Sequence, residues 1–515
     1  MDLEIGRAIE SVKAASKTLV DNFDGNQVFR LLELPAELQL KIIDSLVLSS
    51  SIDQKNWTSS SKYRSPSPEW PISYDWTDLI NLSLTCRYLH SISAPIYQRK
   101  LLVSCFTPYD HKPLRLQIDS FPRLDNVRLR SETSSLQLQQ CQRLYCSHPN
   151  WLKKVTTLVY FGAERYNVDD EIIILDELES QAAQASLELV NRVPALKFFT
   201  ISHTQAWIAQ QMMRTRFDEL TALSLCHIQS PLSNSLDSYS FLSNLKAFKL
   251  RDCHPTWMSL IPRMSKLEDL FISSNPYQIQ FTDLNWFQPE EILPNLRFLK
   301  LSGFEDQENL LNKFFTTIED YRKKGFKFVL EKLELTAKLN KPALKKLMVC
   351  LKDCETLRSL YLSHIPNSTI SKEIFESIAT CGLVNLEKLL IMVQECQVLK
   401  WDTDLVACIE SLSKLKNLRT FFHNHYDVPR GAEDVESDLI FTNQQKVKLK
   451  QSFLNQSNQI FKKFSDNNQF RLKSIVFLQI YFRDGVYGLK SRRDSNFVEE
   501  VDLKDSFSFE SAWST

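Results

Sequence analysis

A six-residue pattern, L-x-x-L-x-L, recurs along most of this chain and constrains its fold more than any other feature. Here L stands for Leu or another apolar residue, and clear copies begin at positions 196, 220, 245, 267, 296, 330, 357 and 386. Weaker copies begin at positions 155, 418 and 472. Successive starts from 196 to 418 lie 22 to 34 residues apart. One such unit cannot bury its apolar side alone, so we expect neighbouring units to stack into a solenoid.

Helical apolar patterns lie between the copies, over residues 310–321, 344–351, 374–378 and 405–412. One strand followed by one helix per unit resembles the leucine-rich repeat, whose parallel strands line a concave face and whose helices cover the convex face. The resemblance is to a degenerate repeat. Cys253 and Asn275 occupy the ninth position, where the family has Asn or Cys, but Ile228, Phe304 and Ile365 stand there in other units.

Two helical patterns precede the repeats, with a Ser/Pro-rich insertion between them at 49–75. The first contains Leu34, Pro35, Glu37, Leu38, Ile42 and Leu46, and the second contains Asp78, Leu79, Leu82, Ser83, Cys86, Arg87 and Leu89. This pair resembles an F-box over about residues 31–105. The insertion is longer than is usual in that family, which the slow growth of loop-closure entropy with length permits.

We therefore expect an α/β solenoid in which an N-terminal all-α F-box-like module is followed by a curved leucine-rich-repeat array. The expected parts are an N-terminal helical or flexible segment at 1–27 and the F-box-like module at 28–106. The degenerate repeat solenoid is expected at 107–490, and a flexible C-terminal tail at 491–515.

The F-box resemblance implies docking to a Skp-type adaptor and, through it, to a cullin. The residues that it implies for this contact are Leu34, Pro35, Leu38, Ile42, Leu79, Leu82 and Leu89. The chain is then expected to be the substrate-recognition subunit of an SCF-type ubiquitin ligase. One alternative is a repeat scaffold that does not lead to ubiquitin transfer, and another is an ordinary helical hairpin that only caps the solenoid.

Side chains alternate between the two faces of a strand, so the third, fifth and seventh positions of each unit point to the concave face. The candidates there for binding a protein substrate are Lys249, Arg251, Phe271, Phe298, Lys300, Tyr361, Leu390, Met392 and Phe422. The first five make a basic zone with aromatic rings, and the last four make an apolar zone. Aromatic and Arg side chains are frequent anchors of protein recognition. The alternative is that they pack against a capping segment or the C-terminal tail.

Composition argues against several other kinds of partner. Lys and Arg number 62, as do Asp and Glu, so the net charge gives no basic excess for nucleic acid. No apolar run approaches the ~20 residues of a membrane span. The 11 cysteines form no C-x-x-C pair, which fits free thiols in a reducing compartment. We expect a cytoplasmic or nuclear protein that binds neither nucleic acid nor membrane.

The sequence contains no motif typical of catalysis, so we expect a non-catalytic protein without a cofactor. It has no G-x-S-x-G, no H-E-x-x-H and no phosphate-binding glycine loop. Three groups invite a metal hypothesis: Cys141 with Cys146 and His148, Cys350 with Cys354, and His423 with His425. Tetrahedral zinc needs four ligands in tightly spaced pairs, and none of these groups has a second pair. We expect no metal site.

Overall fold

The structure is a computed structural model that describes residues 100–104, 152–153, 155–161, 177–202, 204–232, 239–273, 284–302, 308–327, 329–366, 369–393, 405–424, 443–463, 471–481, 485–493 and 497–501. Contacts divide the chain into two compact units, and every described residue belongs to the second, which comprises 55–72 and 98–515. The expected F-box residues between Leu34 and Leu89 lie outside the described part.

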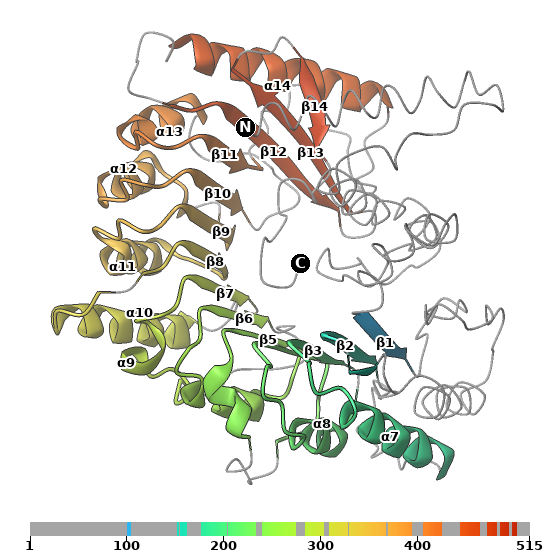
Figure 1. Cartoon of the computed structure of the whole chain (residues 1–515). Coiled ribbons are helices and arrows are strands. Elements are labelled where there is room, and N and C mark those ends of the chain that lie inside the picture. The colour runs from blue at the N-terminus through green and yellow to red at the C-terminus, as the bar shows by residue number, and fades with distance from the viewer. Residues whose placement is uncertain are drawn as a thin grey trace, which may run out of the picture. The chain divides into compact units, whose positions relative to one another are not determined.

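A single sheet runs through the described unit, with its strands in sequence order (Figure 1). The strands are β1 (Lys100–Ser104), β2 (Thr157–Phe161), β3 (Phe198–Ser202), β4 (Ala222–Cys226), β5 (Ala247–Arg251), β6 (Asp269–Ser273), β7 (Phe298–Ser302), β8 (Lys332–Thr336), β9 (Ser359–Ile365), β10 (Lys388–Val393), β11 (Thr420–His423), β12 (Ser474–Tyr481), β13 (Gly485–Arg492) and β14 (Val498–Val501). Neighbours from β1 to β12 are parallel. Each copy of the leucine pattern from 155 to 472 contains one of these strands, which confirms the expected strand positions.

Helical segments connect the parallel strands and lie on one face of the sheet (Figure 1). They are α7 (Glu177–Val190), α8 (Ala206–Met213), α9 (Pro289–Ile292), α10 (Glu308–Lys323), α11 (Lys341–Leu351), α12 (Lys372–Thr380), α13 (Leu405–Ser411) and α14 (Asn443–Lys463), with 3-10 segments at Ser240–Asn244, Pro255–Arg263 and Leu412–Lys414. Local sequence sets the ends: the Asn340 side chain accepts a hydrogen bond from the Ala343 N–H at 2.9 Å and so caps α11. Within the described ranges, no helix combines the length and apolarity needed to cross a bilayer.

The main core lies between the sheet and these helices. The three apolar positions of the pattern point into it, and those of one copy, Leu357, Leu360 and Leu362, are completely buried. The helices contribute their apolar stripes, such as Phe314, Phe315 and Ile318 of α10. Because every unit buries its leucines against the units on both sides, the core continues from repeat to repeat.

Both ends of the sheet differ from the expected boundaries. β1 begins at Lys100, inside the range expected for the F-box-like module, and pairs with β2 in parallel. At the other end, β13 and β14 are antiparallel and extend the sheet to Val501. The expectation of a flexible tail from residue 491 is therefore wrong for 491–493 and 497–501. This hairpin ends the solenoid because its strands pair without any helical crossover.

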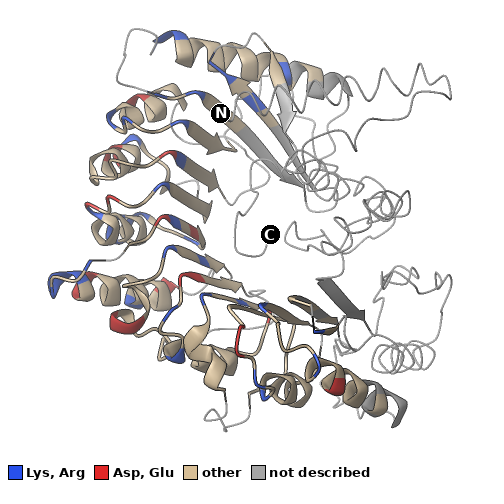
Figure 2. Ribbon diagram, viewed as in Figure 1, with Lys and Arg blue, Asp and Glu red and all other residues tan. Residues whose placement is uncertain are grey.

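Two polar ladders join consecutive repeats at the edge where the chain enters the strands. The first ladder is formed by the residue that follows the first leucine of each pattern, whose charge alternates between positive and negative from one repeat to the next. Its members are Lys246, Glu268, Arg297, Glu331, Arg358, Glu387 and Arg419. Ion pairs join several neighbours, including Lys246 to Glu268 at 2.8 Å and Arg419 to Glu387 at 3.8 Å. Figure 2 shows basic and acidic residues following one another along the stack. Such exposed pairs contribute little energy each, but opposite charges favour the correct neighbour.

The second ladder consists of asparagine amides. Asn295, Asn385 and Asn417 each stand just before the first leucine, and each donates to a carbonyl of the preceding repeat. The acceptors, Ser265, Glu355 and Val384, all lie two residues before the first leucine of their own repeats. The amide ladder that the ninth position lacks is therefore made at the opposite end of the strands. The recurring N-L dipeptide was its signal in the sequence.

The described cysteines are free thiols buried in or beside this core. Burial raises the pKa of the Cys350 thiol and of the Cys381 thiol to about 12. The Cys350 thiol donates to the Phe315 carbonyl at 3.1 Å, and the Cys381 thiol donates to the Met348 carbonyl at 3.0 Å. Both thiols therefore stay protonated and unreactive in the folded chain at neutral pH.

These raised pKa values predict a loss of stability at alkaline pH. In the unfolded chain the thiols lose their protons near pH 9, whereas in the folded chain they keep them until about pH 12. The free energy of unfolding should therefore fall between pH 8 and pH 10, by ~1.4 kcal/mol for each thiol. Urea unfolding followed by circular dichroism measures this. In the Cys350→Ala/Cys381→Ala variant, the fall in the free energy of unfolding between pH 8 and pH 10 should be smaller by ~3 kcal/mol. An equal fall in the variant and the unmodified chain would contradict the prediction.

Candidate functional site

The face of the sheet opposite the helices carries one unbroken row of side chains, which we call the central row. It consists of the third residue of each strand from β3 to β12, and its members are Thr200, Ser224, Lys249, Phe271, Lys300, Glu334, Tyr361, Leu390, Phe422 and Val476. Adjacent strands lie ~4.8 Å apart, so each of these side chains meets its neighbour in the next repeat. No helix of the described residues covers this side of the sheet, which we call the helix-free face.

In the N-terminal half of the central row, one aromatic ring, that of Phe271, lies between two lysines. The Lys249 ammonium lies 4.8 Å from the centroid of the Phe271 ring, and the Lys300 ammonium lies 4.6 Å from it. The two lysines come from the strands on either side of Phe271. A cation held over an aromatic ring is stabilised by the ring's quadrupole, so Phe271 fixes the positions of both ammonium groups.

One carboxylate, Glu334 on β8, holds two of the cations of this face. Its oxygens lie 3.4 Å from the Lys300 Nζ and 3.3 Å from the Lys332 Nζ. Lys332 also lies over two rings, at 5.0 Å from the centroid of Phe298 and 5.2 Å from that of Tyr361. Burial lowers the pKa of Lys332, and the Glu334 charge opposes that shift. The cluster is thus a desolvated ion pair network built among aromatic rings.

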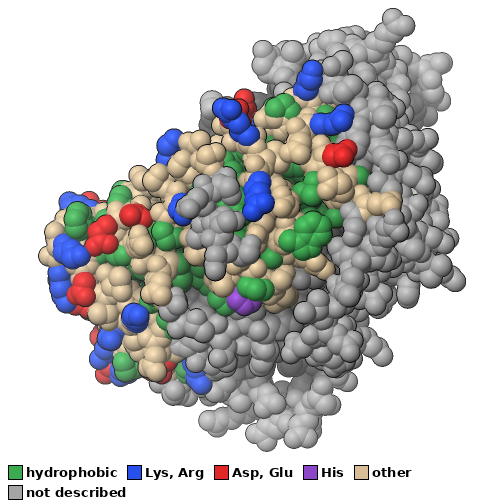
Figure 3. Space-filling view, turned by 90° about the horizontal axis from the view of Figure 1, so that it is seen from below, with side chains coloured by type: hydrophobic (Ala, Val, Ile, Leu, Met, Phe, Trp, Pro, Cys, Tyr) green, Lys and Arg blue, Asp and Glu red, His purple; other side chains and the backbone are tan. Residues whose placement is uncertain are grey.

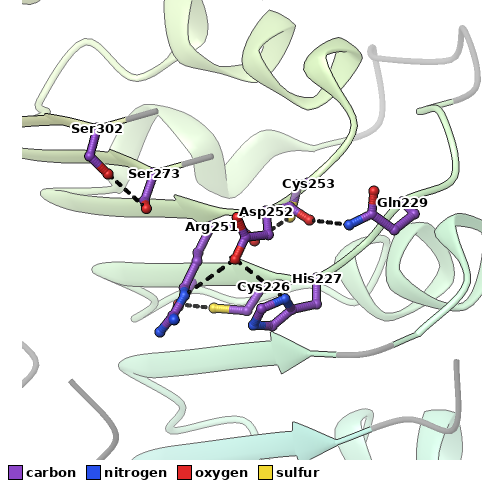
Figure 4. A network of polar contacts seen from close by, with 9 residues as sticks. Cys226, His227, Gln229, Arg251, Asp252, Cys253, Ser273 and Ser302 are labelled. Carbon is purple, nitrogen blue, oxygen red and sulfur yellow. Dashed lines mark hydrogen bonds and ion pairs between the residues drawn. The ribbon is translucent and has the colours of Figure 1, made fainter. Parts of the chain in front are cut away.

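A second charged group lies where β4 and β5 end, as Figure 4 shows. The Asp252 carboxylate lies 3.5 Å from the Arg251 Nε and 3.5 Å from the His227 Nδ1. His227 and Asp252 both have a positive φ, 55° and 48°. This backbone conformation lets the His227 N–H donate to the Arg251 carbonyl at 2.7 Å and the Asp252 N–H donate to the Ser273 carbonyl at 2.8 Å. These strained turns therefore continue the backbone hydrogen bonds between neighbouring repeats beyond the strand ends. They also place the Asp252 carboxylate beside Arg251.

An apolar cluster occupies the C-terminal half of the helix-free face. Its members are Tyr361, Leu390, Met392, Phe422 and Val476, and it is separate from the main core. The Tyr361 and Phe422 rings meet edge to face, with centroids 6.2 Å apart. Each member exposes 6% or less of its surface. Burial raises the pKa of the Tyr361 hydroxyl, so the ring stays neutral at physiological pH.

The nine substrate-binding candidates lie on the helix-free face, where the strands bring them into two groups. Lys249, Phe271, Phe298 and Lys300 belong to the charged cluster around Glu334, and the last four candidates belong to the apolar cluster. Arg251 lies beside Asp252 at the end of β5. Their exposure is low: Lys249 and Phe298 each retain 8%. Sequence reasoning missed Lys332, Glu334 and Val476 as members. All three stand at x positions of their copies, which was the available signal.

The groups that invited a metal hypothesis give no centre in the described part of the chain. Cys350 and Cys354 are buried free thiols. His423 is completely buried and stacks on Phe421, with ring centroids 5.6 Å apart. Among the described residues, no three His, Cys, Asp or Glu side chains are grouped so that they could hold a metal ion. Cys141, Cys146, His148 and His425 lie outside the described ranges.

Comparisons with known proteins find similar chains among solved structures. No family model matches the chain, and no curated protein matches it in sequence. Among solved structures it is similar to an internalin from Listeria monocytogenes, at 16% identity and a TM-score of 0.29, over 53% of this chain and 62% of that one. It is also similar to the protein in a TLR13–ssRNA13 complex, at 16% identity and a TM-score of 0.30, over 54% of this chain and 41% of that one. The chain thus spans less than two thirds of each.

The fold assignment rests on the stack itself, in which one parallel strand from each leucine pattern alternates with a helical segment on a common face. This is a leucine-rich-repeat-like α/β solenoid. Repeats of this kind present alternate side chains of each strand to a shared surface, so a solenoid builds a continuous face from residues far apart in sequence. In this solenoid that face carries the charged cluster and the apolar cluster.

Proposed function

We propose that this chain recruits a protein substrate to an SCF-type ubiquitin ligase. The F-box-like pair between Leu34 and Leu89 docks to a Skp-type adaptor, and the helix-free face of the solenoid holds the substrate. The observation that carries the proposal is the order of these two elements in one chain: an F-box-like sequence followed by a recognition solenoid. Aromatic and basic side chains fixed in place on that face support its role in recognition.

The proposed mechanism is proximity rather than chemistry by this chain. A substrate held on the solenoid meets the ligase's activated ubiquitin carrier at a high effective concentration, so the transfer step becomes effectively intramolecular. The chain contributes binding energy and orientation. Its residues need only hold the substrate long enough for a lysine of the substrate to react.

Adaptor binding tests the first half of the proposal. Leu34→Ala combined with Pro35→Ala removes two apolar contacts of the F-box-like helix, and hot-spot side chains of this kind contribute about 2 kcal/mol or more each. The affinity for the purified adaptor should fall at least about 100-fold, measured by surface plasmon resonance. Gln39→Ala, a polar change in the same predicted helix, is the matched control and should bind as the unmodified chain does. Unchanged adaptor binding by the double variant would rule out this docking mode.

Reconstitution separates a ligase subunit from a scaffold. The full chain, the adaptor, the cullin and the ubiquitin carrier are combined with a protein that co-purifies with the chain when the proteasome is inhibited. Ubiquitin transfer to that protein is expected with the unmodified chain and is expected to be lost with the Leu34→Ala/Pro35→Ala variant. Adaptor binding without any transfer would favour the alternative function, a repeat scaffold.

A further inference from the structure

The apolar cluster on the helix-free face is buried more deeply than the described residues account for. Leu390 keeps only 2% of its surface exposed, and Val476 keeps 1%. Apolar side chains that stand side by side on a sheet cover one another's flanks, but their outer ends are covered only by a second layer. No described helix lies over this face (Figure 1). The cover therefore has to come from a part of the chain outside the described ranges.

Apolar side chains elsewhere on the chain show what an uncovered position is like. Val349 of α11 keeps 49% of its surface exposed, and Trp207 of α8 and Phe326 after α10 are exposed as well. Figure 3 shows hydrophobic side chains that reach the surface between charged ones on the side that it presents. The very low exposure of the apolar cluster thus marks a covered site rather than a solvent-facing one.

The residues that follow β14 have a sequence suited to such a cover. Residues 502–515, which lie outside the described ranges, read DLKDSFSFESAWST. Phe507, Phe509 and Trp513 stand at even spacings in this segment. In an extended chain the three rings would lie on one side, because side chains alternate with a period of two, and Glu510 would lie on the other. The segment can therefore present three large apolar rings to a sheet face and polar residues to solvent.

The segment starts at the edge of the sheet from which it can reach the cluster. β14 ends at Val501, whose partner in β13 is Gly488, and Gly488 pairs with Leu478 of β12. Leu478 lies one residue beyond the last pair of β12 with β11, which is the level of Met392 in β10. From β14 to β9 the sheet spans ~24 Å, at ~4.8 Å per strand. Residues 502–515 reach ~46 Å when extended, so they can cross every strand that carries the cluster.

We infer that residues 502–515 fold back onto the helix-free face and place Phe507, Phe509 and Trp513 on the apolar cluster. The inference goes beyond the proposed function, because it assigns part of the recognition face to a segment of the same chain. The tether keeps this segment at a high effective concentration, so it competes with any free partner. A substrate that uses the apolar cluster must displace it, and this consequence alone rests on the proposed function.

Photo-crosslinking in the full chain tests where the segment lies. The photo-reactive residue p-benzoylphenylalanine takes the place of Phe509, and the irradiated monomer is digested and examined by mass spectrometry. Cross-links to peptides of β9 to β12 are expected, above all to Met392, because benzophenone inserts readily beside sulfur. The same photo-reactive residue in place of Ser508 is the matched control. Position 508 lies on the opposite side of an extended segment, so these cross-links should be lost.

Peptide binding measures the docking itself. A fluorescent peptide of residues 502–515 should bind a shortened chain that ends at Val501, and fluorescence anisotropy gives the affinity. The full chain should bind the same peptide at least about tenfold more weakly, because its own segment already occupies the face. Circular dichroism checks that the shortened chain keeps its fold, and the cross-linking in the full chain does not depend on this variant.

Changes within the peptide separate its two sides. Phe507→Ala with Phe509→Ala and Trp513→Ala removes the three rings and should weaken binding to the shortened chain at least about tenfold. Ser506→Ala with Ser508→Ala changes two residues of the opposite side and should leave the affinity unchanged.

Several results would overturn the inference. Cross-links from position 509 that avoid β9 to β12 would mean that another segment covers the cluster, and cross-linked dimers would place the segment on a second copy of the chain. Equal peptide binding by the full and the shortened chain, or equal binding with and without the three rings, would also overturn it. None of these measurements contains the adaptor, the cullin or a substrate, so failure here is distinguishable from failure of the proposed function.

Discussion

Replacing Trp257 by alanine is expected to lower the free energy of unfolding by about 3–5 kcal/mol, because the change empties a large site in a core that cannot fully collapse. Trp257 is completely buried in the 3-10 segment Pro255–Arg263 and is one of the largest buried side chains of the chain's described part. Its indole Nε1 donates to the Ser230 carbonyl at 3.1 Å. The variant therefore also leaves a partly buried carbonyl without its partner.

Trp207 of α8 provides a matched control for this change. It is the same residue type two repeats earlier, but 45% of it is exposed, and its indole Nε1 donates to the Gln205 side chain instead. Trp207→Ala should cost less than about 1 kcal/mol. Chemical unfolding followed by circular dichroism compares the two variants. Similar losses in both would show that Trp257 is not packed as the structure describes.

Replacing Glu334 by glutamine is expected to cost about 3 kcal/mol, because Lys300 and Lys332 then share a desolvated site without a counter-charge. This cost lies at the lower end of the range for breaking a buried ion pair, because the Lys332 side chain keeps 23% of its surface exposed. The neighbouring carboxylate Glu331 is the matched control. It pairs with Arg297 but its side chain is 39% exposed, so Glu331→Gln should cost less than about 1 kcal/mol.

A triple variant distinguishes loss of charge balance from loss of packing. Glu334→Leu with Lys300→Met and Lys332→Met removes all three charges and keeps apolar volume on the face. Replacing a buried charge network with apolar residues of similar volume often leaves the free energy of unfolding unchanged or raises it. The triple variant should therefore regain most of the stability that Glu334→Gln loses. If the triple variant unfolded as easily as Glu334→Gln, the cost of the single change would lie in side-chain shape. Unfolding midpoints in urea measure each case.

The sequence by itself determined where the strands lie and which side chains point to which face. A strand alternates its side chains with a period of two, so the fourth and sixth residues of L-x-x-L-x-L must face the side opposite to its third and fifth residues. Both are local properties, and for this reason Leu360 and Leu362 could be assigned to the core and Tyr361 to the other face. The F-box-like region between Leu34 and Leu89 remains a prediction, because it lies outside the described residues.

Only the tertiary structure decided which residues of different repeats meet. Lys300 and Glu334 are 34 positions apart, whereas Lys249 and Phe271 are 22 apart, yet both pairs are adjacent in the sheet. Unequal repeat lengths are absorbed by the helical connections, while hydrogen bonding between strands keeps the register. The single carboxylate shared by two lysines and the closing hairpin β13–β14 both depend on that register. Hydrogen bonds across the sheet join residues that no local pattern can relate.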